Sequence, residues 1–551
     1  MSTVSKGDIR SIAGAAFVSL VSVVSTYYFT NLIRDLKDQQ KRLESNEARL
    51  SAKEKTLSAQ KANKEPAGTV IDDVVINKVF LWEVEHLGHY FDAESPSLFN
   101  TMKTGGLNPR SSIAGVKMLS DPESKTEYNR LISSHECVLA DLVRKPEDGK
   151  THTRAYVRAG PRKVLHFDPA TTNAAVVTCG GLCPGLNNVV REITKTLCQL
   201  YSIGGKVYGI RGGYRGFYDP ELEPLILTPE LVEDIHHDGG TILGSSRGGF
   251  DLEKITKFIS DKKIKTLFVI GGDGTHRGAF AIHEGCMKKG LNVAVAGIPK
   301  TIDNDVDYID HSFGFRSAVE AAQAAIRSAK TEAVCNLPNG IGIVKLMGRS
   351  AGFIAVHSTM ASGDVDLCLV PEVPLVLDGE KGCLPFLRQR VKQQGYAVVV
   401  VAEGAGEEVL GTSTEKDASG NKKLPAIGEF LKARIAEYFD SKGDVATVKY
   451  IDPSYMIRSV PANASDSMYC MQLGQNAVHG AMAGYTGFSV GLCNNRMVLL
   501  PIPDLVATSP RSMNPHGRTW ERVLAVTRQP NTVRRLEPGE SIEVHEGGII
   551  R

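Results

Sequence analysis

The chain has 551 residues, of which 42% are hydrophobic and 23% are charged, the composition of an ordinary globular protein. Its formal net charge is +2 at pH 7, so nothing favours broad binding to nucleic acid, and any anion site must be built locally from a few basic side chains. The length predicts more than one lobe, since single hydrophobic cores stop growing near ~250–300 residues. Ten cysteines without regular spacing favour a reduced, intracellular chain over a disulfide framework.

The first sixty residues differ from the rest of the chain. No charged side chain lies between Arg10 and Arg34, and residues 11–33 are long enough to cross a bilayer. Basic residues are dense after this segment, which would place the main body in the cytoplasm if the segment spans a membrane. Three interpretations stay open: a membrane tether, an organelle-targeting presequence, and a helix that packs on the protein or on a partner.

The following segments suggest a division into domains. Residues 34–62 are rich in Lys, Glu, Gln and Ala without Pro or Gly, which predicts an exposed helical spacer. The sequence then predicts an N-terminal segment and spacer over 1–69, an accessory extension over 70–165, a catalytic body of two lobes over 166–505, and a C-terminal tail over 506–551.

From about Asn173 onward, short apolar runs alternate with helical stretches. Such alternation predicts an α/β fold of mostly parallel sheets in two Rossmann-like lobes, with the active site in the cleft between them. Ligands in these sheets gather at the carboxyl ends of the strands. The predicted strands are 174–178, 206–210, 266–270, 293–297, 341–346, 367–370 and 397–402, and the predicted helices are 187–200, 275–289, 315–330, 350–361 and 382–392.

Two glycine-rich turns each follow a predicted strand and open a helix. The first is residues 180–187 (GGLCPGLN), and the second is residues 271–275 (GGDGT). Glycines let backbone N–H groups approach phosphates closely, and a helix start favours anions. In the second turn, Asp273 offers the hard oxygen ligand that Mg²⁺ prefers. A structural turn and a helix-capping aspartate are the alternatives.

A dense polar cluster, residues 297–305 (GIPKTIDND), follows the predicted strand 293–297. Phosphoryl transfer needs groups that orient a hydroxyl, accept its proton and neutralise the phosphates. Asp303 is suited to accept the proton, while Lys300 and Thr301 are suited to hold the moving phosphoryl group.

Basic residues complete the set. Arg247 and Arg349 both lie beside glycines, where a guanidinium can fork onto phosphate oxygens. Residues 455–458 (YMIR) and Lys449 form another basic site, which is suited to a sugar phosphate.

Taken together, these strings resemble the phosphofructokinase family over roughly residues 173–500. Residues 210–217 (IRGGYRGF) and 239–244 (GGTILG) are similar to its long, atypical subgroup of plants and some protists. The resemblance implies transfer of the γ-phosphoryl group of MgATP to the 1-hydroxyl of fructose 6-phosphate, in glycolysis, by an allosteric homotetramer or dimer.

The resemblance also implies a role for each matching residue. Residues that would bind ATP are Gly180, Arg247, Gly248, Gly272, Asp273, Gly274 and Thr275, with Asp273 on Mg²⁺. Asp303 would be the general base, supported by Asp305, and Arg349 would steady charge in the transition state together with Lys300. Glu403 would bind sugar hydroxyls, and Tyr455 and Arg458 would receive the 6-phosphate, near Lys449. The other residues that would contact the sugar are Thr301, Ile302, Met347, Gly348, Met456 and Ile457.

The donor depends on one side chain. Family members that use ATP carry Gly after the Mg²⁺ aspartate, whereas those that use pyrophosphate carry a second Asp, which would clash with the α-phosphate of ATP. Gly274 therefore favours ATP, although Lys300 is common among pyrophosphate users.

Two positions depart from the bacterial pattern. Gly340 stands where bacterial relatives have an Arg that reaches a neighbouring subunit's sugar phosphate, and Tyr455 stands where they have His. The rival hypotheses are a pyrophosphate-dependent phosphotransferase and a membrane-tethered, non-catalytic regulatory subunit.

Overall fold

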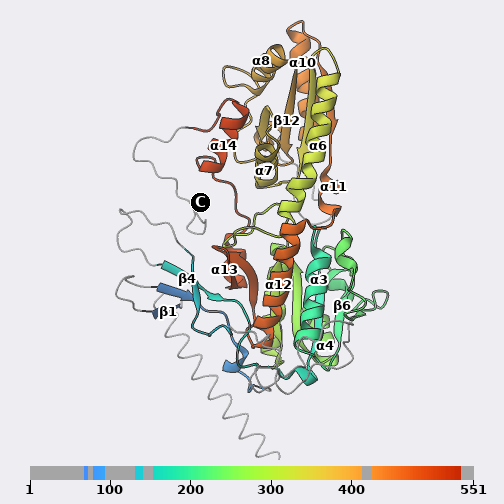
Figure 1. The fold of residues 1–551 in the computed structure, drawn as a ribbon, viewed down its shortest axis with the longest axis vertical. Coiled ribbons are helices and arrows are strands. Elements are labelled where there is room, and N and C mark those ends of the chain that lie inside the picture. Colours follow the sequence, from blue (N-terminus) through green and yellow to red (C-terminus); the bar gives the residue numbers. More distant parts are fainter. Residues whose placement is uncertain (1–67, 72–78, 94–130, 141–152, 412–423, 535–551) are drawn as a thin grey trace, which may run out of the picture. The chain divides into compact units, whose positions relative to one another are not determined.

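The computed structural model describes residues 68–71, 79–93, 131–140, 153–411 and 424–534 (Figure 1). The chain divides into two compact units, residues 1–68 and 69–551. The predicted membrane segment 11–33 and the spacer 34–62 lie outside the described residues. In the described ranges, no helix is both long and apolar enough to cross a bilayer.

The larger sheet forms the first lobe. Its five central strands, β6, β5, β8, β9 and β14, are mutually parallel, whereas β7, β15 and β3 pair antiparallel with their neighbours. From β2, the strand order is β2-β4-β15-β14-β9-β8-β5-β6-β7, with β3 beside β4. The bounds are β1 (Gly68–Ile71), β2 (Val79–Trp82), β3 (Cys137–Leu139), β4 (Thr153–Arg158), β5 (Asn173–Thr178), β6 (Val207–Ile210), β7 (Leu225–Leu227), β8 (Ile264–Gly271), β9 (Ala294–Pro299), β14 (Phe488–Cys493) and β15 (Arg496–Pro501).

Helices cover both faces of this sheet. On β5, Ala174 and Val176 belong to the core that includes α3 and α12, whereas Ala175 and Val177 belong to the core that includes α4 and α5. Side chains alternate between the faces of a strand, so continuous burial of β5 places core on both sides. The helices are α3 (Leu186–Lys195), α4 (Leu252–Asp261), α5 (Asp273–Lys288), α12 (Ala464–Met482) and α13 (Ile502–Thr508).

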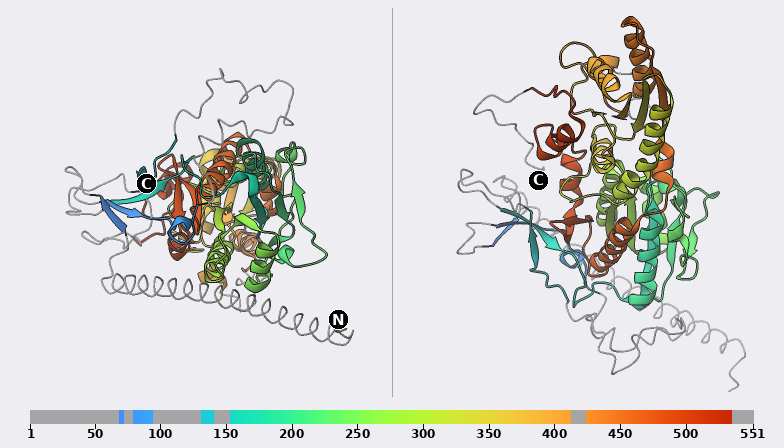
Figure 2. Two further views of the ribbon diagram at one scale, coloured as in Figure 1. Left: turned by 90° about the horizontal axis from the view of Figure 1, so that it is seen from below. Right: turned by 45° about the horizontal axis from the view of Figure 1, so that its top comes forward.

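The second lobe is built on a four-stranded parallel sheet in the order β11-β12-β10-β13. The long helix α6 packs on β10, β12 and β13, and α14 packs on α7 and β11 (Figures 1 and 2). The strands are β10 (Gly340–Leu346), β11 (Leu367–Leu369), β12 (Tyr396–Ala402) and β13 (Thr447–Ile451). The helices are α6 (Phe315–Cys335), α7 (Phe353–Ser362), α8 (Cys383–Gln394), α9 (Glu407–Leu410), α10 (Ile427–Ser441), α11 (Ser454–Ser459) and α14 (Arg518–Thr527).

Five short helical turns complete the described elements. They are the 3-10 turns η1 (Leu87–His89), η3 (Pro169–Thr171), η5 (Gly213–Phe217) and η6 (Ile235–His237), and the π-helical turn η4 (Thr196–Leu200), which extends α3.

This architecture confirms the predicted α/β class with two mostly parallel sheets. All seven predicted strands are present within a few residues, as β5, β6, β8, β9, β10, β11 and β12. Helix α5 begins at Asp273, two residues before the predicted start, so the last three residues of GGDGT already belong to the helix. The predicted domain boundary at residue 505 falls inside α13, and residues beyond it fold as α14.

Candidate active site

A cavity of about 490 Å³ lies at the carboxyl ends of β5, β8 and β9, three neighbouring strands of the first lobe. The second lobe contributes two lining residues, Met347, which follows β10, and Arg458, which lies on helix α11. The lining residues are Cys179, Gly180, Gly181, Leu182, Tyr214, Ser246, Arg247, Gly248, Phe250, Gly272, Asp273, Gly274, Thr275, Lys300, Thr301, Ile302, Asp303, Asp305, Val306, Met347 and Arg458.

The first glycine-rich turn holds the loop that carries Arg247. Gly180 has a positive φ of 87°, and its N–H donates to the carbonyl of Ser246 (2.9 Å). The hydroxyl of Ser245 donates in return to the carbonyl of Gly180 (2.6 Å). A methyl group added to Gly181 would lie 3.6 Å from Arg247 Nη2 and 3.7 Å from Arg458 Nη1. Two guanidinium groups therefore flank this turn, one from each lobe.

The second turn is the start of α5. Its N-cap, Gly272, supplies no side-chain hydrogen bond, which leaves backbone N–H groups of the first turn available to a ligand. The imidazole Nδ1 of His276 lies 3.1 Å from the carbonyl of Gly272, and the hydroxyl of Tyr214 donates to that of Thr275 (2.7 Å). Burial, aided by the charge of Asp305, raises the pKa of Asp273 to about 6.

The position next to Asp273 is open space. Gly274 is exposed to the cavity, and a Cβ atom added there would meet no atom within 4 Å. A side chain at this position would therefore project into the cavity without disturbing the fold.

Lys300 ties the polar cluster after β9 to the first turn. Its ammonium donates to the carbonyl of Gly181 (2.8 Å), and the side chain is buried. Burial lowers the pKa of Lys300. The lysine therefore places a positive charge in the floor between the two glycine-rich turns.

The Oδ1 atom of Asp303 is buried and has no hydrogen-bond partner in the part of the chain that the structure describes. Its backbone N–H donates to Thr301 Oγ1 (3.1 Å), and that hydroxyl donates to Asp305 Oδ1 (2.9 Å). Burial, then the charges of Asp305 and Glu403, raise the pKa of Asp303, while Lys300 and Arg349 oppose this shift. A buried, unpaired carboxyl oxygen is costly unless a ligand completes it.

The second lobe brings Arg349 and Glu403 towards Asp303. The N–H of Glu403 donates to Leu346 O (2.9 Å), and the N–H of Gly404 donates to Gly348 O (3.1 Å), so the loops after β12 and β10 lie together. Arg349 acts electrostatically on the pKa of both Asp303 and Glu403. Gly348, Arg349 and Glu403 are not among the residues that line the cavity in the described ranges.

The predicted sugar-phosphate residues on α11 lie in different surroundings. Arg458 lines the cavity, and its guanidinium lies 4.7 Å from the ring centre of Tyr455. Tyr455 and Met456 are 74% and 70% exposed, whereas Ile457 is buried in the core. Lys449 lies on β13, beside Gly342 of β10, and is absent from the described lining.

The cavity also contains an aromatic pair that was not predicted from the sequence. Phe250 and Tyr214 both line it, with ring centres 5.3 Å apart in an edge-to-face arrangement. Phe250 is 42% exposed. The signal was present in the sequence, since Phe250 directly follows the glycines after Arg247.

The structure explains Gly340. A Cβ atom at this position would lie 1.9 Å from the carbonyl oxygen of Ala333 in α6, so no side chain fits without a backbone shift. An arginine at this position would require α6 and β10 to move apart.

The donor set suits Mg²⁺ held together with a substrate. Among the described residues, no cluster of three or more His, Cys, Asp or Glu side chains could hold a metal ion. Mg²⁺ is commonly held by one or two carboxylates plus substrate phosphates, and Asp273 and Asp305 are close enough for the second to raise the pKa of the first. The site thus fits a metal that arrives with a phosphate chain.

Two lobes with glycine-rich turns, basic side chains and an unpaired carboxyl oxygen around one cavity define a phosphoryl-transfer type of site. The phosphofructokinase family model matches residues 173–481, and the chain belongs to the phosphofructokinase family. Similar relatives are "ATP-dependent 6-phosphofructokinase 7" (50% identical, covering 68% of this chain and 77% of the relative) and "ATP-dependent 6-phosphofructokinase 1" (48%, covering 76% and 87%), both from Arabidopsis thaliana. A similar solved structure is the pyrophosphate-dependent phosphofructokinase from Marinobacter aquaeolei (TM-score 0.53, 22% identical, covering 67% of this chain and 94% of that chain), a likeness of fold.

Proposed function

We propose that the protein is an ATP-dependent 6-phosphofructokinase, which converts fructose 6-phosphate to fructose 1,6-bisphosphate. The observation that carries the proposal is Asp303, whose Oδ1 is buried and unpaired among the described residues, and which lines the same cavity as the two glycine-rich turns. A raised pKa suits a general base that takes a hydroxyl proton near neutral pH. The named relatives support the same activity.

Each group around the cavity has a role in this reaction. Asp303 accepts the proton of the 1-hydroxyl, with Asp305 and Thr301 orienting it through their hydrogen bonds. Lys300 and Arg349 neutralise charge on the moving phosphoryl group. Arg458 binds the 6-phosphate, while Glu403 binds sugar hydroxyls. The other predicted sugar-site residues, whose roles stay predictions, are Met347, Gly348, Tyr455, Met456, Ile457 and Lys449.

The donor we propose is ATP. Gly274 leaves the space beside Asp273 open, so the α-phosphate meets no carboxylate there. The exposed ring of Phe250 offers a stacking surface for a base, for which pyrophosphate has no use. The cavity volume of about 490 Å³ lies in the range of small-molecule sites.

Mg²⁺ is the cofactor we propose, held by Asp273 and the phosphates of ATP. When bound, it would neutralise phosphate charge. The protein's own contribution is Lys300, Arg247 and the first-turn N–H groups of α5, which bind the phosphate chain.

The test is formation of fructose 1,6-bisphosphate by the full chain with Mg²⁺ and either ATP or pyrophosphate. We expect turnover with ATP, a loss of about 10²–10⁴-fold in Asp303→Asn, and impaired use of ATP in Gly274→Asp. A Cβ atom at Gly274 meets no atom within 4 Å, so this variant tests the choice of donor more than the packing. Turnover with pyrophosphate alone would replace ATP by the rival donor. A folded protein that binds fructose 6-phosphate without turnover would support the regulatory-subunit hypothesis.

A homo-oligomer is part of the proposal. Tyr455 and Met456 on α11 and Met468 and Met471 on α12 are exposed large side chains on consecutive helices, a pattern typical of an interface. Light scattering of the full chain tests this expectation. Since Gly340 cannot carry a side chain without a backbone shift, any contact across subunits to the sugar phosphate must come from another residue.

Attachment to a membrane through residues 11–33 stays a proposal beside organelle targeting and helix packing. Fractionation of cells that express the full chain distinguishes the three: membrane recovery favours the tether, and a shortened N-terminus in an organelle favours targeting.

A further inference from the structure

The segment after α13 joins the two loops that carry the proposed catalytic residues. On the first-lobe side, Ser509 Oγ accepts the N–H of Asp307 (3.1 Å), and the N–H of Arg511 donates to the carbonyl of Asp305 (2.7 Å). The segment therefore lies against the chain that directly follows Asp303. It also lies beyond residues 173–481, the range matched by the family model.

The guanidinium of Arg511 fixes the shape of that chain. Its Nε donates to the carbonyl of Asn304 (3.1 Å) and its Nη1 donates to the carbonyl of Ile309 (3.1 Å). Asn304 has a positive φ of 58°, in the left-handed region that asparagine tolerates better than most residues. Arg511 holds the carbonyl of this turn residue, one position from Asp303.

The same segment contacts the second lobe next to Arg349. The guanidinium carbon of Arg511 lies 5.4 Å from the ring centre of Phe353, at the start of α7. The hydroxyl of Ser512 donates to the carbonyl of Ser350 (3.2 Å). The carboxylate of Glu372 accepts both the N–H of Met513 (2.8 Å) and the N–H of Gly352 (2.9 Å).

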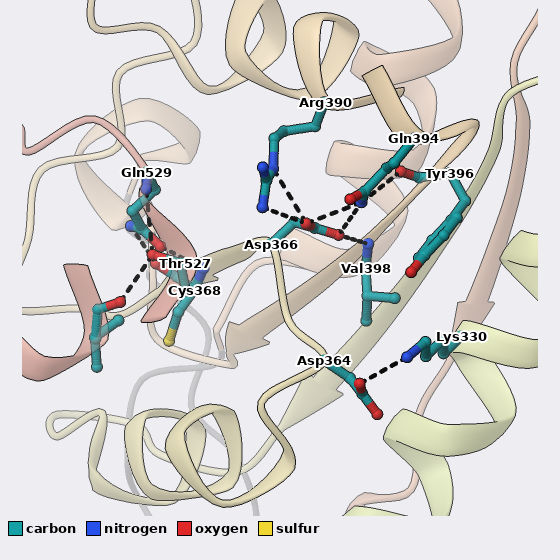
Figure 3. Close-up of polar contacts among 11 residues, drawn as sticks. Lys330, Asp364, Asp366, Cys368, Arg390, Gln394, Tyr396, Val398, Thr527 and Gln529 are labelled. Carbon is teal, nitrogen blue, oxygen red and sulfur yellow. Dashed lines mark hydrogen bonds and ion pairs between the residues drawn. The ribbon is translucent and has the colours of Figure 1, made fainter. Parts of the chain in front are cut away.

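The far end of the segment is anchored on the second lobe. Gln529 pairs with the edge strand β11: its Oε1 accepts the N–H of Cys368 (2.7 Å) and its Nε2 donates to the carbonyl of Cys368 (2.9 Å) (Figure 3). Trp520 of α14 is fully buried. The chain from Ser509 to Gln529 is thus held at both ends, one on each lobe.

We propose that Arg511 is a positioning residue for phosphoryl transfer, which sets the Asp303 loop of the first lobe in register with the Arg349 loop of the second. This inference rests on the proposed function. Reacting groups must be held within a fraction of an ångström, and a misplacement of ~1 Å can cost about 10²-fold in rate. Arg511 holds the carbonyl groups of the Asp303 loop, and Ser512, the next residue, holds the carbonyl of Ser350 beside Arg349.

The experiment replaces Arg511 by Met in the full chain and measures kcat, KM for each substrate and thermal stability. Arg162→Met is the matched control, since Arg162 also donates to two carbonyls, those of Gly160 (3.4 Å) and Arg158 (2.5 Å), and lies 5.5 Å from the ring centre of Tyr485. Both variants lose two hydrogen bonds to carbonyl groups and one contact with an aromatic ring, but only Arg511 lies between the two loops and acts electrostatically on Asp305. A third variant, Arg511→Lys, keeps the charge over Phe353 but lacks the fork that spans two carbonyls.

We expect Arg511→Met to lower kcat by about 10²-fold with little change in KM for ATP, and Arg511→Lys to recover part of kcat. Arg162→Met should lower stability while kcat stays near that of the unchanged protein. If Arg511→Met fails to fold, a kcat in folded Arg511→Lys equal to that of the unchanged protein would overturn the inference, and a reduced kcat would support it. Equal kcat losses in the Arg511 and Arg162 variants would also overturn it. Absence of turnover in the unchanged protein would instead count against the proposed function.

Discussion

At the scale of single residues, the proposed active site depends on a few side chains whose surroundings differ sharply. Asp303 has a buried oxygen without a partner among the described residues, whereas Phe250 exposes an aromatic face to the cavity. The first suits proton transfer and the second suits stacking. Separate kinetic constants report on these two properties, so they can be tested independently.

Replacing Phe250 by Ala should raise KM for ATP by about tenfold, because base–aromatic stacking contributes roughly 1–3 kcal/mol. The KM for fructose 6-phosphate should stay unchanged. Phe250→Tyr is the conservative control and should keep the KM for ATP of the unchanged protein. An equal rise in both KM values for Phe250→Ala would indicate a general disturbance of the site and contradict the stacking role.

The pH profile reports on Asp303. Burial and neighbouring carboxylates raise its pKa to about 8 in the free protein, so kcat/KM for fructose 6-phosphate should rise with pH towards that value as the base loses its proton. Glu403 is one of the charges that raise this pKa. Glu403→Gln should therefore lower the pKa of Asp303 and move the rising limb to lower pH, even though sugar binding weakens. A limb at unchanged pH would contradict the role of Asp303 as the titrating base.

At the scale of elements, the edge strand β11 is covered by the side chain of Gln529, as Figure 3 shows. Gln529→Ala should lower the free energy of unfolding by about 1–3 kcal/mol, because it leaves the N–H and carbonyl of buried Cys368 without their partner. Thr532→Ala is a control on the same segment, since Thr532 is half-buried and its hydroxyl donates to Pro374 O in a solvent-exposed bond. Urea unfolding compares the two variants. Equal losses would show that the edge pairing contributes nothing beyond a surface contact.

Elements with one strong pattern were predictable from the sequence, and elements with a mixed pattern were not. Strands β8, β9 and β12 are almost continuously buried; β9 and β12 are uninterrupted apolar runs, and β8 is one from Leu267 onward. Strand β13 is half-buried along its whole length and gave no such run. The β14–β15 hairpin was missed although its turn, Asn494 and Asn495, has positive φ at both residues, the conformation that asparagine favours in tight hairpins.

The candidate site was likewise predictable in part from the sequence. Local motifs predicted the residues of the two glycine-rich turns and of the Lys300–Asp305 loop, because each motif follows a predicted strand and ligands gather at the carboxyl ends of such strands. Arg511 has no local motif, since its role arises only when the C-terminal segment returns to a loop about two hundred residues earlier in the chain. Side-chain direction on α11 was also beyond the sequence: Arg458 lines the cavity, whereas Met456 is exposed.

At the scale of the whole described body, the chain passes between the lobes repeatedly. It builds most of the first sheet, crosses to the second lobe with α6, returns with α12, β14 and β15, and crosses again before α14 (Figure 1). Neither lobe is formed by one continuous stretch. We therefore expect the two lobes to unfold together.

The two tryptophans make this expectation measurable. Trp82 lies on β2 of the first lobe, and Trp520 is buried in α14 on the second. In Trp82→Phe and Trp520→Phe, the fluorescence of the remaining tryptophan should report the same urea midpoint after correction for the stability of each variant by circular dichroism. Two separated midpoints would show that the lobes unfold independently.

The late return of the chain also bears on how the protein is made. A ribosome that has just released α11 has delivered all four strands of the second sheet, but the first sheet still lacks β14 and β15 and the second lobe still lacks Trp520 and Gln529. Until the last stretch emerges, β9 has one bare edge, and so does β11. The nascent chain thus exposes two sheet edges at once during synthesis, and such edges are where chaperones and aggregation compete.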